Sequence, residues 1–157
     1  MRAVANSPTD VIASLALAGT TVAVAESLTG GLLCARLTDV PGASRVVLGG
    51  VVAYSTPSKH EVLGVPEETL RNHGAVSAQT ASAMAIAVSR QFSAHVGIAT
   101  TGVAGPDSQE GQDVGTVFIA IARGERTHVV QLMLDGTREQ IRALTVDHAL
   151  ALLASGD

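Results

Sequence analysis

Apolar runs rich in Val, Ile and Ala are spread through this chain, and a segment with helical spacing precedes each of the first three. Two further β-type runs follow, with Gly124-Glu125 in the short connection between them. Helices that alternate with strands favour parallel pairing, whereas a short connection favours an antiparallel hairpin. We therefore expect an α/β fold, a three-layer α/β/α sandwich with a mixed, mostly parallel sheet. The predicted strands cover residues 21–25, 46–54, 96–100, 114–122 and 127–134.

The predicted helices begin at residues that commonly cap or open helices. Ser58, Ser77 and Thr137 are expected N-caps, while Pro8 and Pro66 suit a first helical turn. The helices should cover residues 8–18, 32–38, 59–64, 66–72, 78–92 and 138–153. The buried side of the last helix should carry Ile141, Leu144, Val146 and Leu150. Residues 1–7 are expected to be loose.

Length and charge restrict the class of protein. A chain of 157 residues suits one domain (1–157), because it can bury about two-thirds of its unfolded surface. A formal charge of −4 without a basic cluster argues against a nucleic-acid partner. No apolar stretch approaches the ~20 residues that cross a bilayer, and no signal-peptide pattern opens the chain, so we expect no membrane association. Cys34 is the single cysteine, which excludes an internal disulfide, and we expect a cytoplasmic protein.

Three polar turns follow predicted strands: Glu26–Gly31, Tyr54–Lys59 and Thr101–Pro106. The carboxyl ends of neighbouring parallel strands lie at one edge of a sheet, and ligand-binding groups gather there in α/β proteins. If the three strands are parallel neighbours, their turns share that edge. This convergence is the main reason, from the residues alone, to predict a functional site.

The first of these turns places a hydroxyl, that of Ser27, between a strand and the start of a helix. Free N–H groups and the helix dipole favour anions at such a start, so we predict that Ser27 is a nucleophile in an anion-favouring turn. Thr29, Gly30 and Gly31 are candidate substrate-binding residues. Their structural alternative is simpler, with Thr29 as a helix cap and the glycines supplying turn geometry. The stretch alone is a weak phosphate-loop signal, because it lacks the Walker spacing and lysine.

A serine nucleophile needs a base, and neither a Gly-x-Ser-x-Gly motif nor a suitably placed histidine supplies one. The five histidines match no metal-ligand spacing, so no metal site is predicted. Lys59 is the only lysine, and burial or a nearby cation can lower the pKa of a lysine toward neutrality. Tyr54, the only tyrosine, could orient Lys59 or relay a proton. Both residues also have ordinary alternatives, an exposed helix start and a packed ring with its hydroxyl in water.

Two arginines near the start of the last predicted helix, Arg138 and Arg142, lie one turn apart. Together they suit a phosphate or a carboxylate, although arginines on a terminal helix more often face solvent. Gly102 and Gly105 of the third polar turn are weak signals by themselves, because glycine and proline occur in most loops. Periodicity and composition alone thus indicate a small α/β domain and leave open whether it is an enzyme for an anionic ligand.

Several motifs occur along the chain in a characteristic order: Ala25–Gly31, Gly49–Ser55, Lys59 with Leu63–Val65, Glu67–Leu70, His73–Ser77, Thr101–Pro106, Val114–Val117, and Gly136–Arg138 with Arg142. In this order and spacing they resemble the CinA C-terminal domain family, which includes nicotinamide-nucleotide amidases, over roughly residues 10–155. The chain departs from the family's usual residues at Leu28, Thr56 and Asp113. We expect the Leu28 side chain to point away from the chemistry.

The resemblance implies an amidohydrolase of pyridine nucleotide salvage, with the three-layer fold and a homo-oligomeric assembly. Its nucleotide substrate would be nicotinamide mononucleotide, its products nicotinate mononucleotide and ammonia, and it would need no metal or organic cofactor. It implies Ser27 as the nucleophile, Lys59 as the base, and Tyr54 and Thr101 as assisting residues. The substrate phosphate would bind Arg138 or Arg142.

This hypothesis requires the Ser27 hydroxyl to lie within about 3.2 Å of the Lys59 amine, or one water away. Backbone N–H groups of the Ser27–Gly31 turn or of the Gly102–Gly105 loop would stabilise the oxyanion. Ser55 is the next candidate nucleophile. Two alternatives stay open: a non-catalytic nucleotide-binding or assembly module, and an amidase for a different pyridine or nucleotide amide.

Overall fold

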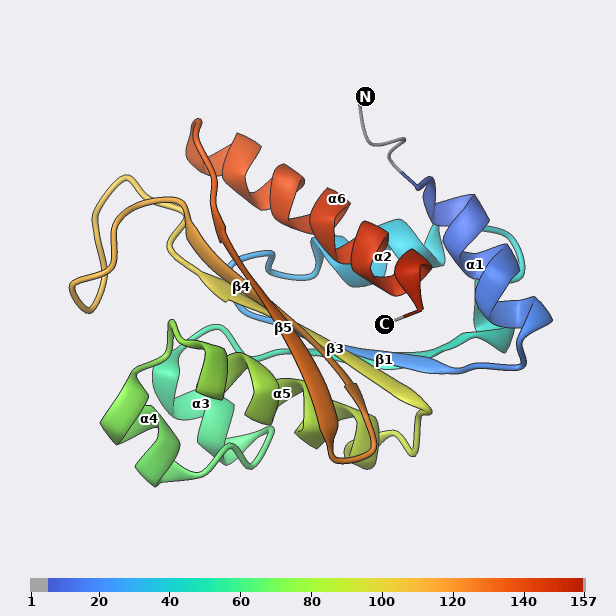
Figure 1. Ribbon diagram of the computed structural model, residues 1–157, viewed down its shortest axis with the longest axis horizontal. Helices are drawn as coiled ribbons and strands as arrows, with labels where there is room; N and C mark the ends of the chain where they lie inside the picture. Colours follow the sequence, from blue (N-terminus) through green and yellow to red (C-terminus); the bar gives the residue numbers. More distant parts are fainter. Residues whose placement is uncertain (1–5, 157) are drawn as a thin grey trace.

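The computed structural model describes residues 6–156 and shows a central sheet between two helical layers (Figure 1). The sheet contains β1 (Val22–Glu26), β2 (Val47–Val52), β3 (Val96–Gly102), β4 (Thr116–Arg123) and β5 (Arg126–Met133), in the order β2-β1-β3-β4-β5. β1 pairs in parallel with β2 and β3, whereas β4 pairs antiparallel with β3 and β5. Among these strands β4 alone runs against the others, which confirms the predicted mixed, mostly parallel sheet.

Helices cover both faces of this sheet, as a three-layer sandwich requires (Figure 1). One face carries α1 (Pro8–Leu17), α2 (Leu32–Thr38) and α6 (Arg138–Ser155). The other face carries α3 (Thr56–Glu61), α4 (Glu67–His73) and α5 (Ala78–Gln91). A single turn of 3-10 helix, Ala43–Arg45, precedes β2.

β1 lies between β2 and β3, and it is buried on both faces because helices cover both sides of the sheet. Its two valines pack in the core on the α6 side, and its two alanines pack in the core on the α5 side. Small residues let α5 approach the sheet closely: a Cβ added at Gly97 would lie 2.0 Å from the carbonyl oxygen of Ala85. The alanine-rich composition therefore supports close helix–sheet packing.

Side-chain caps mark the predicted helix starts at Ser77 and Thr137. Each hydroxyl accepts a hydrogen bond from the backbone N–H three residues ahead, and Gln140 completes a reciprocal capping box with Thr137. Ser7 caps α1 in the same way, although it was expected to belong to a loose start. Residues 1–5 of that start lie outside the described residues.

Two details of the predicted helices are wrong. α3 begins at Thr56 and is capped by Ser55 rather than Ser58, because the fixed φ of Pro57 suits a first helical turn. On α6, Leu144 is 37% exposed although burial was expected, since the buried stripe of that helix lies toward its other side.

Candidate active site

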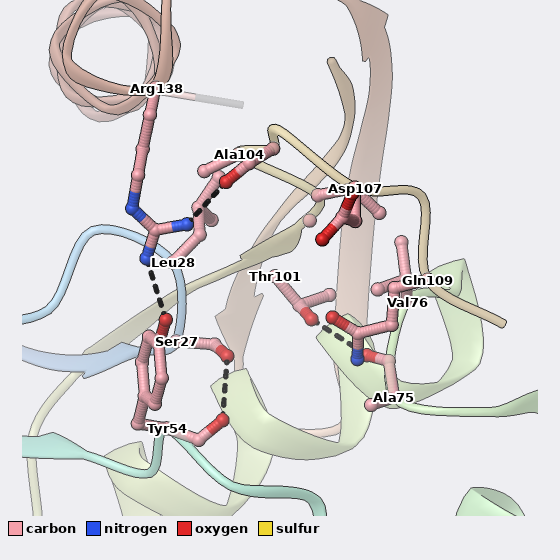
Figure 2. A pocket seen from close by; sticks show the side chains of 13 residues that line it. Ser27, Leu28, Tyr54, Ala75, Val76, Thr101, Ala104, Asp107, Gln109 and Arg138 are labelled. Atoms are coloured by element: carbon pink, nitrogen blue, oxygen red, sulfur yellow. Dashed lines mark hydrogen bonds between the residues drawn. The ribbon is translucent and has the colours of Figure 1, made fainter. Parts of the chain in front are cut away.

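The three polar turns meet at one edge of the sheet, because β2, β1 and β3 are parallel neighbours. A pocket of about 120 Å³ lies at this edge. Its lining residues come from all three turns, the α4–α5 connection, the loop before β4 and the start of α6 (Figure 2): Ser27, Leu28, Tyr54, Ala75, Val76, Thr101–Gly105, Asp107, Gln109 and Arg138. The predicted convergence of the turns is therefore confirmed.

The hydroxyl of Ser27 lies against the amine of Lys59 in this site. Ser27 directly follows β1, and its backbone N–H donates to the carbonyl of Thr100 at 3.0 Å, which fixes its position beside β3. Lys59 comes from α3, and its Nζ lies 2.9 Å from Ser27 Oγ. This is the contact that the serine–lysine hypothesis requires.

The amine of Lys59 is surrounded by oxygen acceptors. The residue is 1% exposed, and Nζ also lies 2.8 Å from the carbonyl oxygen of Ala53 and 3.2 Å from that of Tyr54. No carboxylate within residues 6–156 forms an ion pair with it. Burial lowers the pKa of Lys59 from 10.5 to about 8, and the negative charge of Glu110 opposes part of that shift. The site therefore holds a lysine that becomes neutral near physiological pH.

Tyr54 contacts both ends of the site through different groups. Its carbonyl oxygen accepts hydrogen bonds from Lys59 and, at 3.4 Å, from Ser27 Oγ. Its hydroxyl accepts from Arg138 Nη2 at 2.7 Å, while Arg138 Nη1 donates to the carbonyl of Gly105 at 2.6 Å (Figure 2). The phenol group therefore contacts Arg138 rather than the lysine amine, and Arg138 bridges the second and third turns.

The third turn forms a wall of backbone and small side chains. Thr101 is buried, lines the pocket and donates its hydroxyl to the carbonyl of Ala75 at 2.6 Å (Figure 2). Gly102 and Gly105 also line the pocket, and a Cβ at either would lie 2.7 Å from atoms of residues 114–116. Glycine is required at both positions because the approach to β4 passes so close behind them.

Thr29, Gly30 and Gly31 do not line this pocket. The Thr29 hydroxyl is buried and shares a 2.8 Å hydrogen bond with the hydroxyl of Thr100. Gly30 and Gly31 have φ values of 57° and 104°, which L side chains rarely adopt. Gly31 rather than Thr29 is the N-cap of α2. The structural alternative accounts for the glycines, and the three residues shape the turn instead of the cavity.

Arg142 is also absent from the pocket lining and binds the back of the first turn. Its Nε donates to the carbonyl of Leu28 at 2.9 Å and its Nη2 to that of Thr29 at 3.2 Å. Leu28 packs in the core on the α6 side and also lines the pocket. Of the two arginines considered as phosphate ligands, the structure brings Arg138 alone to the pocket.

Glu26, the last residue of β1, occupies the helix start that was expected to favour an external anion. Its carboxylate accepts from the backbone N–H of Leu33 at 2.8 Å and from that of Cys34 at 3.1 Å, and the residue is 1% exposed. The prediction of an anion site at the start of α2 is therefore wrong, because a buried side chain already satisfies those donors. The sequence did contain a signal for this contact, namely an acidic residue at the end of an apolar strand. Burial, and then the charge of Glu26, raise the pKa of Cys34.

The loop 107–113 was expected to be polar and exposed, yet one of its side chains anchors it. Glu110 accepts from the N–H of Ala75 at 2.9 Å and from that of Val76 at 3.3 Å. This contact holds Asp107 and Gln109 where they line the pocket (Figure 2). The sequence offered no signal for it, since the partners are backbone groups more than thirty positions away.

The histidines take no part in this pocket. His60 pairs with Glu67, and His95 bonds Thr21 at the opposite end of β1. Within residues 6–156, no group of three His, Cys, Asp or Glu side chains is arranged to hold a metal ion. The described helices include none with the length and apolar character needed to cross a bilayer.

A three-layer α/β/α domain with a serine and a buried lysine at the carboxyl edge of its sheet defines a recognisable class. The chain matches the family model of the CinA C-terminal domain over residues 5–156, and it belongs to that family.

Known members agree with this assignment. A CinA-like protein of Frankia casuarinae is 49% identical over 143 residues, which cover 91% of this chain and 33% of that protein. A CinA superfamily structure from Klebsiella pneumoniae has a TM-score of 0.93 at 32% identity, covering 98% of this chain and 97% of that chain. The competence/damage inducible protein CihA of Agrobacterium tumefaciens has a TM-score of 0.90 at 36% identity, covering 96% and 93%. The chain spans about a third of the length of the curated relatives it matches, and their names state no reaction.

Proposed function

We propose that this protein is an amidase that hydrolyses the carboxamide of nicotinamide mononucleotide, with Ser27 as the nucleophile and Lys59 as its base. The observation that carries the proposal is the 2.9 Å contact between Ser27 Oγ and a lysine amine that is buried without a carboxylate partner. Membership of the CinA C-terminal domain family supports the reaction class. The motifs of this chain resemble that family, and the family includes nicotinamide-nucleotide amidases.

The hydrogen bonds of Lys59 suit a base. A neutral amine has two N–H donors and one lone pair, and the carbonyl oxygens of Ala53 and Tyr54 can take the two donors. The lone pair is then left for the Ser27 hydroxyl. A pKa of about 8 leaves roughly a tenth of the amine neutral at pH 7 and half at pH 8. Proton removal by Lys59 therefore needs no further group.

The tetrahedral intermediate requires donors for its oxyanion. Leu28 follows the nucleophile and lines the pocket, and its backbone N–H has no hydrogen-bond partner within residues 6–156. Ala104 and Gly105 of the third turn also line the pocket, and their N–H groups have no hydrogen-bond partner within residues 6–156. Each well-placed donor contributes about 3–4 kcal/mol to the stability of the transition state. We assign the first donor to Leu28 because it directly follows the proposed nucleophile in the chain.

Arg138 is the proposed phosphate ligand. A guanidinium has five N–H donors, and contacts with Tyr54 and Gly105 use two of them. The remaining donors can bind a phosphate at the mouth of the pocket while Tyr54 keeps the arginine in place. Anchoring the phosphate would position the distant amide against Ser27, so that binding energy supports the chemistry.

The reaction then proceeds in two balanced steps. Ser27 Oγ forms a bond to the amide carbon, Lys59 takes the hydroxyl proton and returns it to the leaving nitrogen, and ammonia departs. Water next attacks the acyl-enzyme, with Lys59 taking a proton and returning it to Ser27 Oγ as nicotinate mononucleotide is released. The net reaction adds one water to one amide.

The test is ammonia release from nicotinamide mononucleotide by the pure chain. Ser27→Ala should abolish release while preserving the melting temperature within about 1–2 °C, since the change removes a single oxygen atom and keeps the backbone hydrogen bond to Thr100. Ser55→Ala is the matched control: it removes a neighbouring hydroxyl that caps α3, and it should retain turnover at a slightly reduced stability. If turnover survives Ser27→Ala and is lost in Ser55→Ala, the nucleophile is Ser55 and not Ser27.

A non-catalytic nucleotide-binding or assembly module is the second candidate. It is favoured by the short span of this chain relative to its curated relatives, in which the matching region is one part of a longer protein. Saturable binding of nicotinamide mononucleotide without ammonia release would support the module. Release from another pyridine or nucleotide amide, but not from this one, would keep the amidase and change its substrate.

A further inference from the structure

A second cluster of cationic side chains lies on the β4–β5 hairpin, far from the candidate active site. Arg123, Arg126, Thr127 and His128, together with the apolar Ile121, line a pocket of about 130 Å³. The active-site pocket adjoins the start of β4, whereas this pocket adjoins its end. Since β4 is 8 residues long, roughly 25 Å of strand separates the two.

The pairing of the strands brings two positive charges face to face. Arg123 and Arg126 are direct partners in the β4–β5 register, and His128 is the partner of Ile121. Residues two apart on a strand share a face, so His128 lies on the same face as the arginines. Like charges directly opposite each other destabilise a pair of strands. The hairpin therefore has an electrostatic cost that an anion between the arginines would remove.

No described side chain neutralises this pair. Glu125, the acidic residue of the hairpin turn, is bound to Arg90 of α5, which covers the opposite face of the sheet. Neither Arg123 nor Arg126 forms an ion pair within residues 6–156. Across the same residues, Arg123 Nε is the single buried side-chain nitrogen or oxygen without a hydrogen-bond partner. A buried donor that lacks an acceptor is unfavourable and calls for an explanation.

We propose that the hairpin pocket, defined by Arg123, Arg126 and His128, binds a phosphate-type oxyanion. Guanidinium groups match the oxygens of a tetrahedral oxyanion and form charge-assisted hydrogen bonds with them. Such a ligand gives Arg123 Nε an acceptor. Its negative charge attracts both arginines and so offsets the repulsion between them. Ile121, which is 2% exposed, closes the apolar side of the pocket. The inference goes beyond the proposed amidase and does not depend on it, because none of these residues belongs to the Ser27 pocket.

The test is a titration of the nitrogen-15-labelled chain with inorganic phosphate, followed by nuclear magnetic resonance at constant ionic strength and pH. Saturable shifts should centre on Arg123, Arg126 and His128, with a dissociation constant on the order of 1 mM or below. Arg126→Gln removes one charge-assisted contact and should weaken binding about tenfold or more. Arg45→Gln is the matched control, because Arg45 is exposed beside β2 at the opposite edge of the sheet, and it should bind as the parent does.

Stability provides an independent readout. Arg126→Gln relieves the repulsion, so without phosphate its melting temperature should equal or exceed that of the parent chain. At the same phosphate concentration, the melting temperature of the parent and of Arg45→Gln should rise more than that of Arg126→Gln. Because Arg123 is partly buried, the exposed Arg126 is the better position to change.

Three outcomes would overturn the proposal. Shifts that grow linearly with phosphate, without saturation, would indicate diffuse attraction instead of a binding site. Equal binding by Arg126→Gln would remove the hairpin from the interaction. Shifts confined to residues around Arg138 would report the active-site pocket alone.

Discussion

Two walls of the candidate active site are held in place in different ways. The first wall is the turn after β1 that carries Ser27, and several buried contacts fix it independently. Glu26 joins it to the start of α2, Thr29 joins it to β3, and Arg142 joins its carbonyls to α6. Loss of one contact leaves the others in place.

The second wall is the loop 107–113, whose residues are largely exposed. Within residues 6–156, its side-chain anchor to the rest of the domain is the carboxylate of Glu110 on two backbone N–H groups, and the Asp113 carbonyl accepts from the Thr116 N–H at 3.1 Å. A Cβ at Gly74 would collide with that carboxylate, at 2.3 Å from Oε2, so a glycine is needed where the loop is anchored. The side chain of Glu110 thus anchors the second wall, whereas three side chains anchor the first.

The difference in how the two walls are anchored matches a difference in their roles: the first wall carries the reacting groups, and the second shapes the binding cavity. A displacement of about 1 Å at reacting groups can reduce a rate by 10²-fold, so the nucleophile benefits from redundant support. A wall that only shapes the cavity tolerates more motion, and motion there admits the ligand. We expect changes in the first wall to lower kcat and changes in the second to alter KM.

The largest effect is expected for Lys59→Met, which removes the base from the fixed wall and keeps the length of the side chain. Ammonia release should fall by roughly 10²–10⁴-fold, the usual contribution of general base catalysis. The melting temperature at pH 7 should be unchanged or higher, because an apolar side chain has no charge to desolvate. A variant that keeps more than a tenth of the parent rate would show that Lys59 is not the base.

The next effect is a dependence of activity on pH. Because the neutral amine is the base and the pKa of Lys59 is about 8, kcat/KM should rise about tenfold per pH unit below pH 8 and level off above it. A profile that is flat between pH 6 and 8, or that falls with rising pH, would contradict the assignment.

The same pKa predicts a stability difference with a defined sign. The pKa of Lys59 is lowered from 10.5 to about 8 by folding, so between these values the unfolded chain binds more protons than the folded one. Stability relative to Lys59→Met should therefore rise with pH across that window, by up to roughly 3 kcal/mol, and stay constant below pH 8. Urea unfolding of both chains from pH 7 to pH 10.5 measures the difference.

A smaller effect is expected for Arg142→Gln, which removes one of the three supports of the first wall. Two backbone carbonyls lose a charged donor, so the free energy of unfolding should fall by about 1–3 kcal/mol. We expect kcat to fall about tenfold, with KM and the pH profile unchanged, because Arg142 positions the turn without touching the substrate. Arg138→Gln is the matched control and should raise KM at nearly constant stability. A rise in KM alone for Arg142→Gln would make it a phosphate ligand instead.

Much of this arrangement could be predicted because its determinants are local. Strand runs, caps such as Ser77 and Thr137, and the short hairpin connection specify the elements, and alternation specifies a sheet with parallel neighbours. The meeting of Ser27 and Lys59 follows from that topology once the family resemblance has singled out the pair. These predictions needed the order of the elements and no knowledge of side-chain direction.

The parts that could not be predicted depend on the direction of long side chains. Arg138 and Arg142 are one turn apart on a helix, yet one reaches the pocket and the other the back of the turn. Glu26 sits next to Ser27 in sequence but points into the start of α2. Spacing cannot distinguish such cases, because the choice depends on which backbone donors and acceptors lie free nearby.

The smallest effect, and the sharpest test of the contrast between the walls, is Glu110→Gln. The amide retains one acceptor oxygen but loses the charge, so the loop should loosen, with KM rising a few-fold and stability falling by about 1 kcal/mol. The charge of Glu110 raises the pKa of Lys59, so its loss should move the midpoint of the pH profile to lower pH and increase kcat at pH 7.

A rise in KM together with a rise in kcat at pH 7 from one substitution would distinguish a latch on the second wall from a support of the nucleophile. Glu61→Gln is the control, because it makes an equal change of charge at an exposed position of α3 that is close to Lys59 in sequence. It should alter neither kcat nor KM. A fall in kcat with an unmoved pH midpoint would mean that the two walls are one rigid unit, because loosening the loop would then have disturbed Ser27 and Lys59 themselves.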